Sequence, residues 1–498
     1  METFGLRGGP PAAPLARMLR ASAFLVLVAC GSVTNTLPDA GTADDAPGDA
    51  DVPDASEPAP SIATVLDCGT PASAGGLRPG GDLQRVDLDL AAFPNARCND
   101  GSAGTFYFRP AATAAGATRW VIQLQGGGAC RDGDDCARRW CSVDTNFGMT
   151  QMSAMLAPAG GIPGDGILLR GAANPISDAN QVFVRYCSSD AWVGTTGPMD
   201  VDALHPVSGD PIRYRIDFHG RDILDAVIAM LRRDGGTLPA YTLGGGSAVL
   251  ADLDMASNVL FAGASAGGSG AIQNADRLNT TLRAHNTCLD CTLEFNTLID
   301  SIFGPRGDLL DWTTSLLCTV GGACTYEAVI AAARGLYDGE SDESCVSWHA
   351  TNAPATAYLC KDPGHVVRNH VTTPMMVRMG LLDQQIGGNF VETGMSVPGE
   401  GVMTPARFAK LVHDQLVELA DLRTLAEEGP AIAREPATFG PPCPDHETLS
   451  TNPSVFDVTV TSANAPRTML DIFGAWRAGG SPIHAVWEGG DPVDCGAQ

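Results

Sequence analysis

A serine between glycines, at the end of an apolar run, is the feature that most constrains this fold. The run Ala256–Ala262 predicts a buried strand, and Ala271–Leu278 predicts a helix. Between them, Gly263-Ala-Ser-Ala-Gly267 fits G-x-S-x-G, a sharp strand-to-helix turn that exposes a serine hydroxyl above a sheet. A chain with 58 Gly produces such spacings by chance, so a plain glycine-rich turn is an equal interpretation of the pattern alone. Ser265 is therefore a candidate nucleophile whose partners must be sought elsewhere.

The first 30 residues have the layout of a secretory signal rather than of a folded segment. Three arginines precede the apolar stretch Ala21–Ala29, which is too short to be a stable membrane anchor. The stretch ends at Leu27-Val-Ala-Cys30, which resembles a bacterial lipobox. We therefore expect residues 1–30 to be a lipoprotein-type signal and Cys30 to be the lipidated first residue of the mature chain. An ordinary signal peptide cut nearby is the alternative.

Residues 31–65 are predicted to form a disordered acidic spacer. The segment Gly31–Ile62 is rich in Asp, Ala, Pro and Thr and contains no Lys or Arg. Such a composition buries too little apolar surface to offset the loss of chain entropy on folding. No second linker, repeat or low-complexity segment follows, so we expect residues 66–498 to form one large domain.

Cysteine content and charge indicate the compartment and exclude some partners. The chain has 15 Cys, and without Cys30 the even number that remains allows up to seven disulfides in an oxidising compartment, although their pairing cannot be deduced from spacing. The pair Cys288-Leu-Asp-Cys291 lacks the further ligands of a zinc site, so the sequence predicts no metal. The formal net charge of −26 argues against binding nucleic acid or anionic lipid headgroups through a basic face.

Strand and helix patterns alternate along the chain, which predicts βαβ units and a mainly parallel sheet. The predicted strands are Arg119–Gln125, Gln181–Tyr186, Asn296–Asp300 and Pro374–Gly380, and the predicted helices are Gly220–Leu231 and Pro405–Glu428. The first of these strands runs directly into three glycines, Gly126–Gly128. Backbone N–H groups left unshielded at such a strand end are typical of an oxyanion hole, and a flexible turn is the alternative.

A serine nucleophile in this kind of sheet is followed along the chain by an acid and then a histidine. Asp383 lies just beyond a predicted core strand, where such sheets place functional residues, although an aspartate there can also merely cap the next helix. His446 lies in a proline-rich loop, and His484 lies in a pattern typical of a late strand. The residues favour His446 only slightly. The other histidines after Ser265 that precede the acid fit this order poorly: His285, His349, His365 and His370.

Eight separate segments carry a family resemblance, and they occur in the family's order between about residues 66 and 495. They are Leu124-Gln-Gly-Gly-Gly-Ala-Cys130, Tyr186-Cys-Ser-Ser-Asp-Ala-Trp192, Gly263-Ala-Ser-Ala-Gly-Gly268, Asn274-Ala-Asp-Arg277, Asp300-Ser301, Asp383-Gln-Gln-Ile386, Phe439-Gly-Pro-Pro-Cys-Pro-Asp-His-Glu447 and Val493-Asp-Cys495. These segments resemble motifs of the pectin acetylesterase/Notum family of carboxylester hydrolases. The resemblance implies a single disulfide-rich, α/β-hydrolase-like domain with a mainly parallel central sheet flanked by helices.

The resemblance also implies roles for particular residues, and it strongly favours His446 over His484 as the catalytic base. It implies a catalytic triad of Ser265, Asp383 and His446, oxyanion donors at Gly127, Gly128 and Ala266, and substrate-binding residues Trp192, Ser188 and Asp190. Two regions depart from the family. Family members commonly carry Trp where this chain has Gly128, which predicts a more open pocket wall, and the segment 308–371 matches poorly.

These features predict hydrolysis of a carboxylic ester through a covalent acyl-enzyme, with no metal or organic cofactor. A chain tethered to the cell envelope by a lipid anchor, at the outer membrane or cell surface, would meet extracellular polymers, so O-acetylated polysaccharide is the first expected substrate; a secreted protein is the alternative location. A lipase-like deacylase of longer acyl chains, including acyl groups on protein serine, is the alternative activity. A catalytically silent protein that binds glycan or peptide on the same scaffold is a hypothesis from another class.

Overall fold

The computed structural model describes residues 57–68, 77–143, 147–233, 250–289, 291–316, 318, 322–421, 435–489 and 495. The predicted signal peptide, Cys30 and most of the predicted spacer lie outside the described residues. None of the helices in the described ranges is both long enough and apolar enough to cross a membrane.

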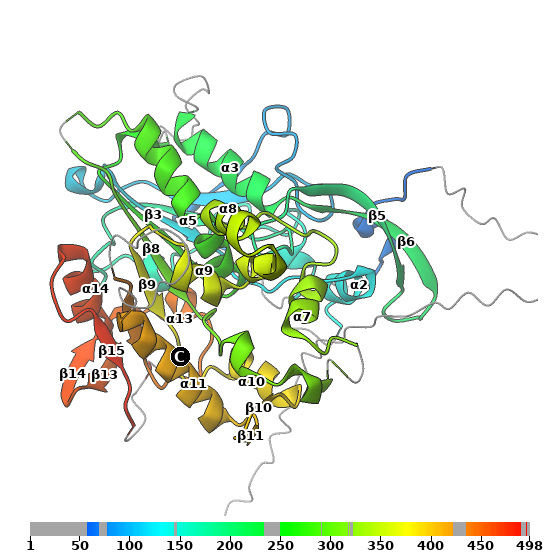
Figure 1. The fold of residues 1–498 in the computed structure, drawn as a ribbon. Coiled ribbons are helices and arrows are strands. Elements are labelled where there is room, and N and C mark those ends of the chain that lie inside the picture. The colour runs from blue at the N-terminus through cyan, green and yellow to red at the C-terminus, as the bar shows by residue number, and fades with distance from the viewer. Residues whose placement is uncertain are drawn as a thin grey trace, which may run out of the picture.

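A nine-stranded sheet forms the centre of the molecule (Figure 1). Its strands, in order across the sheet, are β1 (Gln84–Asp87), β2 (Thr105–Arg109), β4 (Asn180–Val184), β3 (Arg119–Leu124), β7 (Asn258–Ala264), β8 (Glu294–Asp300), β9 (Met375–Arg378), β12 (Ala437–Gly440) and β15 (His484–Val486). Strand β2 pairs antiparallel with β1 and β4, and every neighbouring pair from β4 to β15 is parallel. The predicted fold class is confirmed, and β7, which leads to Ser265, is central as expected.

Helices cover both faces of this sheet. Alternate side chains along its strands point to opposite faces, and each face forms its own hydrophobic core with the helices that cover it. On β7, for example, Val259 and Phe261 join one core while Leu260 and Ala262 join the other. The first core is closed by α3 (Gly220–Leu231), α5 (Ala266–His285), α9 (Pro363–Asn369) and α11 (Pro405–Glu418), and the second by α13 (Thr448–Thr451) and α14 (Met469–Ala478). The remaining α-helices are α1 (Ile62–Val65), α2 (Gly133–Trp140), α7 (Tyr326–Ala333), α8 (Glu343–Asn352) and α10 (Gln384–Glu392).

Among the described residues, three hairpins lie outside the central sheet. They are β5 (Thr196–Leu204) with β6 (Pro211–Phe218), β10 (Ser396–Val397) with β11 (Gly401–Val402), and β13 (Thr459–Ser462) with β14 (Ala465–Thr468). The long β5–β6 hairpin extends away from the sheet at the right of Figure 1. It receives the N-terminal end of the domain, because the N–H of Ala59 donates to Asp200 at 3.0 Å and Ile62 is fully buried. The folded domain therefore includes residues 57–65, which the sequence analysis assigned to the spacer.

Helix patterns predict the helix bounds well where an amphipathic stripe has a distinct end. Helix α3 has the predicted bounds of Gly220 and Leu231, and its apolar stripe of Ile223, Val227 and Leu231 is buried. Helix α11 begins at Pro405 as predicted but ends at Glu418 and passes into a short 3-10 turn over Leu419–Asp421. The rest of the predicted helix, up to Glu428, lies outside the described residues.

Seven disulfides join all the cysteines that follow Cys30, which confirms the number expected and fits an exported protein. The pairs are Cys68–Cys141, Cys98–Cys187, Cys130–Cys136, Cys288–Cys291, Cys318–Cys324, Cys345–Cys360 and Cys443–Cys495. The last of these ties the loop after β12, which carries His446, to the C-terminal segment.

A buried ion pair links the carboxyl ends of two central strands. Asp300 is the last residue of β8 and Arg378 the last residue of β9; their side chains are fully buried and lie 2.6 Å apart. The other oxygen of Asp300 accepts the backbone N–H of Leu449 at 2.8 Å, and its carbonyl accepts the N–H of Ser265 at 2.9 Å. One aspartate thus connects the serine turn, β9 and the segment that follows His446.

Replacing Arg378 with methionine should destabilise the domain by about 3–5 kcal/mol, because the carboxylate of Asp300 would remain buried without its cation. Chemical unfolding under non-reducing conditions measures this difference. Lys410→Met is the matched control, since Lys410 pairs with Asp414 on the exposed side of α11. Equal unfolding midpoints for the two variants would contradict a structural role for the buried pair.

Candidate active site

Ser265 lies in a strained backbone conformation between β7 and α5. Its φ of 53° and ψ of −125° are rare for a residue with a side chain, and strain of this kind persists only where the surroundings impose it. The flanking glycines show how tight the turn is. A methyl group on Gly263 would lie 2.1 Å from the carbonyl oxygen of Gly267, and one on Gly267 would lie 2.3 Å from that of Leu124. The G-x-S-x-G stretch is therefore a strand-turn-helix elbow.

Asp383 and His446 meet beyond the carboxyl ends of β9 and β12. One carboxylate oxygen of Asp383 lies 2.8 Å from Nδ1 of His446. The other oxygen accepts the N–H groups of Gln385 and Ile386 at 3.0 and 2.9 Å, so Asp383 also caps α10. The structure thus shows the helix cap that the sequence offered as one interpretation, and it places the same side chain against the histidine of the predicted triad.

The loops that carry these two residues are held together by backbone hydrogen bonds. The N–H of Leu381 donates to Pro441 at 2.8 Å, and that of Gln384 donates to Pro444 at 3.0 Å. The Cys443–Cys495 disulfide fixes the second loop from its other side. Because the backbone, rather than a single flexible side chain, holds the geometry, the acid and the histidine are positioned before any substrate binds.

The imidazole of His446 is oriented to accept a proton at Nε2. A carboxylate only accepts hydrogen bonds, so the proton lies on Nδ1 and the neutral ring leaves Nε2 as an acceptor. Within the described part of the chain, Nε2 is buried and has no hydrogen-bond partner. The structure contains no hydrogen bond from Ser265 Oγ to this nitrogen; such catalytic contacts are often long without substrate and tighten in the reacting complex.

Three backbone amides are available near the elbow as oxyanion donors. Ala266 is the first residue of α5, where a helix leaves its N–H groups unpaired. Gly127 and Gly128 follow β3 with φ angles of 146° and 64°. Among the residues that the structure describes, the N–H groups of Gly127, Gly128 and Ala266 donate to no other group. These N–H groups can therefore donate hydrogen bonds to a developing negative charge without first breaking a hydrogen bond within the protein.

The segment from Tyr186 to Trp192 supports the glycine loop from behind. Tyr186 Oη donates to the carbonyl of Gly128 at 2.8 Å, and Trp192 Nε1 donates to that of Gln125 at 3.0 Å. Asp190 accepts the N–H groups of Trp192 and Gly220 at 3.0 and 2.6 Å.

These contacts bear on the substrate-binding role expected for Ser188, Asp190 and Trp192. All three side chains are fully buried, and Ser188 Oγ donates to Asp190 at 2.7 Å. Burial raises the pKa of Asp190 to about 6, although its hydrogen bonds with Ser188, Gly220 and Trp192 lower it. This placement favours a role in positioning the loop over direct contact with a substrate.

Glu447 is a second carboxyl group beside the histidine, and the sequence analysis gave it no role. Its N–H donates to Ser301 Oγ at 2.9 Å, and a methyl group on Gly126 would lie 1.8 Å from its carboxylate. Burial, partly offset by His446 and reinforced by Asp300 and Asp383, raises the pKa of Glu447 to about 7. Its position next to His446 in the sequence is the signal that could have drawn attention to it.

Phe147 lies beside Gly128, where the sequence predicted an open wall. A methyl group on Gly128 would lie 3.0 Å from Cε2 of this ring. The guanidinium of Arg139 stacks over the same ring, 4.7 Å from its centroid. An aromatic side chain from a different segment thus fills space next to the glycine, which corrects the expectation of an open wall at this point. Phe147 is distant from Gly128 in sequence, so no motif indicated it.

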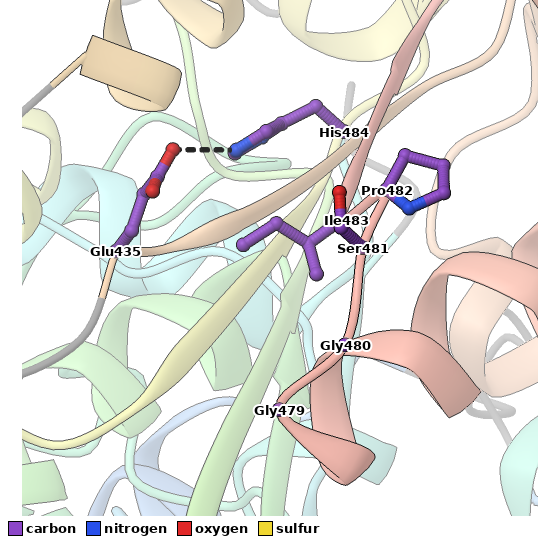
Figure 2. A pocket seen from close by; sticks show the side chains of 7 residues that line it. All are labelled: Glu435, Gly479, Gly480, Ser481, Pro482, Ile483 and His484. Atoms are coloured by element: carbon purple, nitrogen blue, oxygen red, sulfur yellow. Dashed lines mark hydrogen bonds and ion pairs between the residues drawn. The ribbon is translucent and has the colours of Figure 1, made fainter.

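His484, the alternative base, lies at the amino end of its strand, whereas the predicted triad lies beyond the carboxyl ends of the strands. It is the first residue of β15, whereas Asp383 and His446 follow the last residues of parallel strands. Its Nε2 lies 2.8 Å from Glu435, and its Nδ1 lies 3.0 Å from Thr438 Oγ1. Figure 2 shows His484 and Glu435 lining a surface pocket with residues 479–483. This pocket is therefore separate from the serine elbow, and His484 is paired there.

Known proteins resemble this chain most clearly in the part that contains the serine elbow. Residues 83–294 match the Pectinacetylesterase family model, a range that includes Ser265 and Gly128 but ends before Asp383 and His446. The crystal structure of the Wnt deacylase Notum from Drosophila covers 83% of this chain and 98% of that chain, with a TM-score of 0.55 and 22% sequence identity. This likeness shows the shared fold.

Curated relatives support the same family. The palmitoleoyl-protein carboxylesterase NOTUM of Schmidtea mediterranea is 26% identical over 302 residues, which make up 59% of this chain and 48% of that protein. Pectin acetylesterase 11 of Arabidopsis thaliana is 26% identical over 196 residues, which make up 39% of this chain and 41% of that protein. The matches thus span about half the length of these relatives or less.

The pH dependence of turnover should respond to Glu447. Burial lowers the pKa of His446, but its hydrogen bond and charge interaction with Asp383, together with the charges of Glu447 and Asp300, raise that pKa above its ordinary value. Only the neutral imidazole accepts a proton, so kcat/KM should fall as the pH drops through this raised pKa. Glu447→Gln removes the negative charge that Glu447 carries when it is ionised, so it should move the acid limb of kcat/KM to lower pH.

The control for this profile is Asp445→Asn, which removes an exposed charge from the same loop. Water screens that charge, so its loss should leave the acid limb in place. Profiles that shift equally in both variants, or in neither, would contradict the influence assigned to Glu447.

Proposed function

We propose that this chain is a serine carboxylester hydrolase of the pectin acetylesterase/Notum family, with Ser265, His446 and Asp383 as its triad. The observation that carries the proposal is the Asp383–His446 pair, which leaves Nε2 of the histidine unpaired, in a fold where a strained serine elbow ends the central strand. The family model over residues 83–294 and the two named relatives support an ester-cleaving activity. A silent binding protein would have no need of this strained turn or of a correctly oriented imidazole.

In the proposed reaction, Ser265 Oγ attacks the ester carbonyl while Nε2 of His446 takes the hydroxyl proton. Asp383 stabilises the imidazolium, and the amides of Gly127, Gly128 and Ala266 donate to the oxyanion of the tetrahedral intermediate. The ester bond then breaks, and His446 gives its proton to the leaving alcohol. Water attacks the acyl-serine by the same route, which releases the carboxylic acid and restores the serine.

The acyl group is proposed to be short, as in an O-acetyl ester of an extracellular polysaccharide. Phe147 occupies space beside Gly128 and would limit the room for a long acyl chain next to the oxyanion loop. The similarity to proteins named palmitoleoyl-protein carboxylesterases favours a longer acyl chain instead, and this remains the second candidate. Lipidation at Cys30, which would tether the enzyme to the cell envelope, is proposed from the lipobox resemblance.

Ser265→Ala should abolish turnover of p-nitrophenyl acetate, with a fall of roughly 10⁶-fold in kcat because the nucleophile itself is lost. The protein should be produced in an oxidising compartment so that its disulfides form. Ser269→Ala is the matched control one turn further along α5, and it should retain activity. Hydrolysis by Ser265→Ala at the rate of the unmodified enzyme would refute the esterase proposal.

Phe147→Ala should shift the preference toward longer acyl chains. Removing the ring opens space beside Gly128, so kcat/KM for p-nitrophenyl octanoate should rise by roughly tenfold relative to the acetate. Phe93→Ala, which removes a partly buried ring that is not one of the nearest neighbours of Gly128, should leave this ratio unchanged. An unmodified enzyme that already prefers long-chain esters would overturn the short-acyl proposal while leaving the triad intact.

A further inference from the structure

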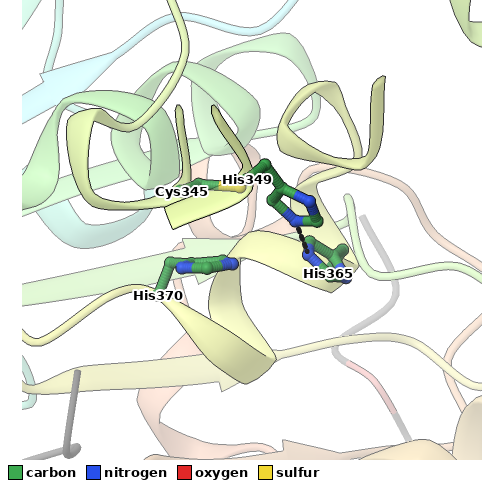
Figure 3. A group of neighbouring side chains, drawn as sticks. All are labelled: Cys345, His349, His365 and His370. Carbon is green, nitrogen blue, oxygen red and sulfur yellow. Dashed lines mark hydrogen bonds between the residues drawn. The ribbon is translucent and has the colours of Figure 1, made fainter. Parts of the chain in front are cut away.

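Two buried histidines and one partly buried histidine converge in the segment that matches the family poorly. His349 lies on α8, His365 on α9, and His370 is the residue that ends α9. One ligand atom from each, together with Sγ of Cys345, lies within 4.8 Å of all the others. Figure 3 shows the three imidazole rings gathered beside Cys345 between the two helices. None of these side chains takes part in the proposed ester hydrolysis.

We propose that His349, His365 and His370 form a binding site for a first-row divalent metal ion such as Zn²⁺. Imidazole nitrogen is a preferred ligand of zinc, with a metal–nitrogen distance of about 2.0–2.1 Å, so two ligands of a tetrahedral ion lie roughly 3.3 Å apart. Nε2 of His349 and Nε2 of His365 lie 3.1 Å apart, close to that separation. His370 would complete a three-nitrogen set after a small inward movement of its ring.

His370 is the residue that distinguishes a metal site from a hydrogen-bonded cluster. Its side chain is fully buried, and within the described part of the chain neither of its ring nitrogens has a hydrogen-bond partner. A neutral imidazole always carries one N–H donor and one acceptor, and leaving both unpaired in the interior costs free energy. A metal ion at the centre of the cluster would occupy the acceptor of His370 and relieve part of this cost.

Hydrogen bonds outside the cluster bear on how its rings are turned. Nδ1 of His349 lies 3.3 Å from the carbonyl of Ala353, which orients this ring with Nε2 toward the cluster. Nδ1 of His365 lies 3.2 Å from Nδ2 of Asn369, which also donates to the carbonyl of His365 at 3.2 Å.

Cys345 is close to the cluster but is bonded to Cys360. Metal ions bind the thiolate form of cysteine, so the disulfide sulfur is not counted as a ligand. The proposed set is therefore three histidines, with the fourth position open to water or another small ligand.

A metal at this site would join two helices of the segment 342–373, which hydrogen bonds already anchor on α5. Gln273 of α5 already donates to the carbonyl of Cys360 at 3.0 Å and accepts the N–H of Asp342 at 2.7 Å. Asp276 of the same helix accepts the N–H groups of Thr372 and Thr373, each at 2.8 Å. The ion would join α8 to α9 within this anchored segment, so its expected effect is on stability.

The test is metal binding by the full exported chain with its disulfides intact. After treatment with chelator and removal of the chelator, the protein should bind about one Zn²⁺ per chain, and its melting temperature should rise on binding. Titration with Co²⁺ should give the intense visible absorption of a four-coordinate ion. Because loss of even an outer-shell partner typically weakens metal binding by about 10–100-fold, His370→Gln should weaken it by at least about 100-fold.

The control variant is His285→Gln, which removes an exposed histidine at the end of α5 and should bind Zn²⁺ as the unmodified chain does. Failure of the unmodified chain to bind Zn²⁺ or Co²⁺ stoichiometrically would overturn the proposal, even if His370→Gln does not fold. Binding that occurs only after reduction of the Cys345–Cys360 disulfide would also overturn the three-histidine set, since it would require the thiolate. Neither outcome bears on the esterase proposal, which the Ser265→Ala variant tests separately.

Discussion

The buried pair of Asp300 and Arg378 is the interaction on which the geometry of this site depends. The carboxylate of Asp300 and the guanidinium of Arg378 are both fully buried and lie 2.6 Å apart, so they join β8 and β9 at their carboxyl ends. The same aspartate binds the backbone of Ser265 through its carbonyl and that of Leu449 through its carboxylate. Ser265 and the segment that follows His446, which are far apart in the chain, are therefore both attached to Asp300.

A second constraint is the hydrogen-bonded contact between the loops after β9 and β12. Parallel neighbouring strands bring their carboxyl ends to the same edge of the sheet, and a proline-rich loop fixed by a disulfide has few conformations to lose. In this arrangement the side chain of Asp383 caps α10 with one oxygen and orients His446 with the other. Asp383 is held by the helix whether or not a substrate is present, so in the proposed reaction it would already be in position.

Sequence analysis found residues whose chemistry is encoded by local patterns. The glycines on either side of Ser265 are required because the backbone of neighbouring segments passes too close for a side chain. The parallel sheet and helix α3 were predicted from hydrophobic periodicity. The residues that escaped it act through contacts between distant segments. Glu447 and Phe147 lie next to Gly126 and Gly128 in space, and the three histidines meet within a segment that hydrogen bonds anchor on α5.

The sequence by itself determined the α/β class, the order of strands and helices, the even set of cysteines, and the choice of Ser265, Asp383 and His446 as candidates. These follow from periodicity, turn chemistry and chain order, which are local properties. Only the tertiary structure decided which cysteines pair, that Trp192 and Asp190 support the loop from inside, and that Phe147 stands beside Gly128. Those outcomes depend on which strands become neighbours, and that is settled by burial across the whole core rather than by any single segment.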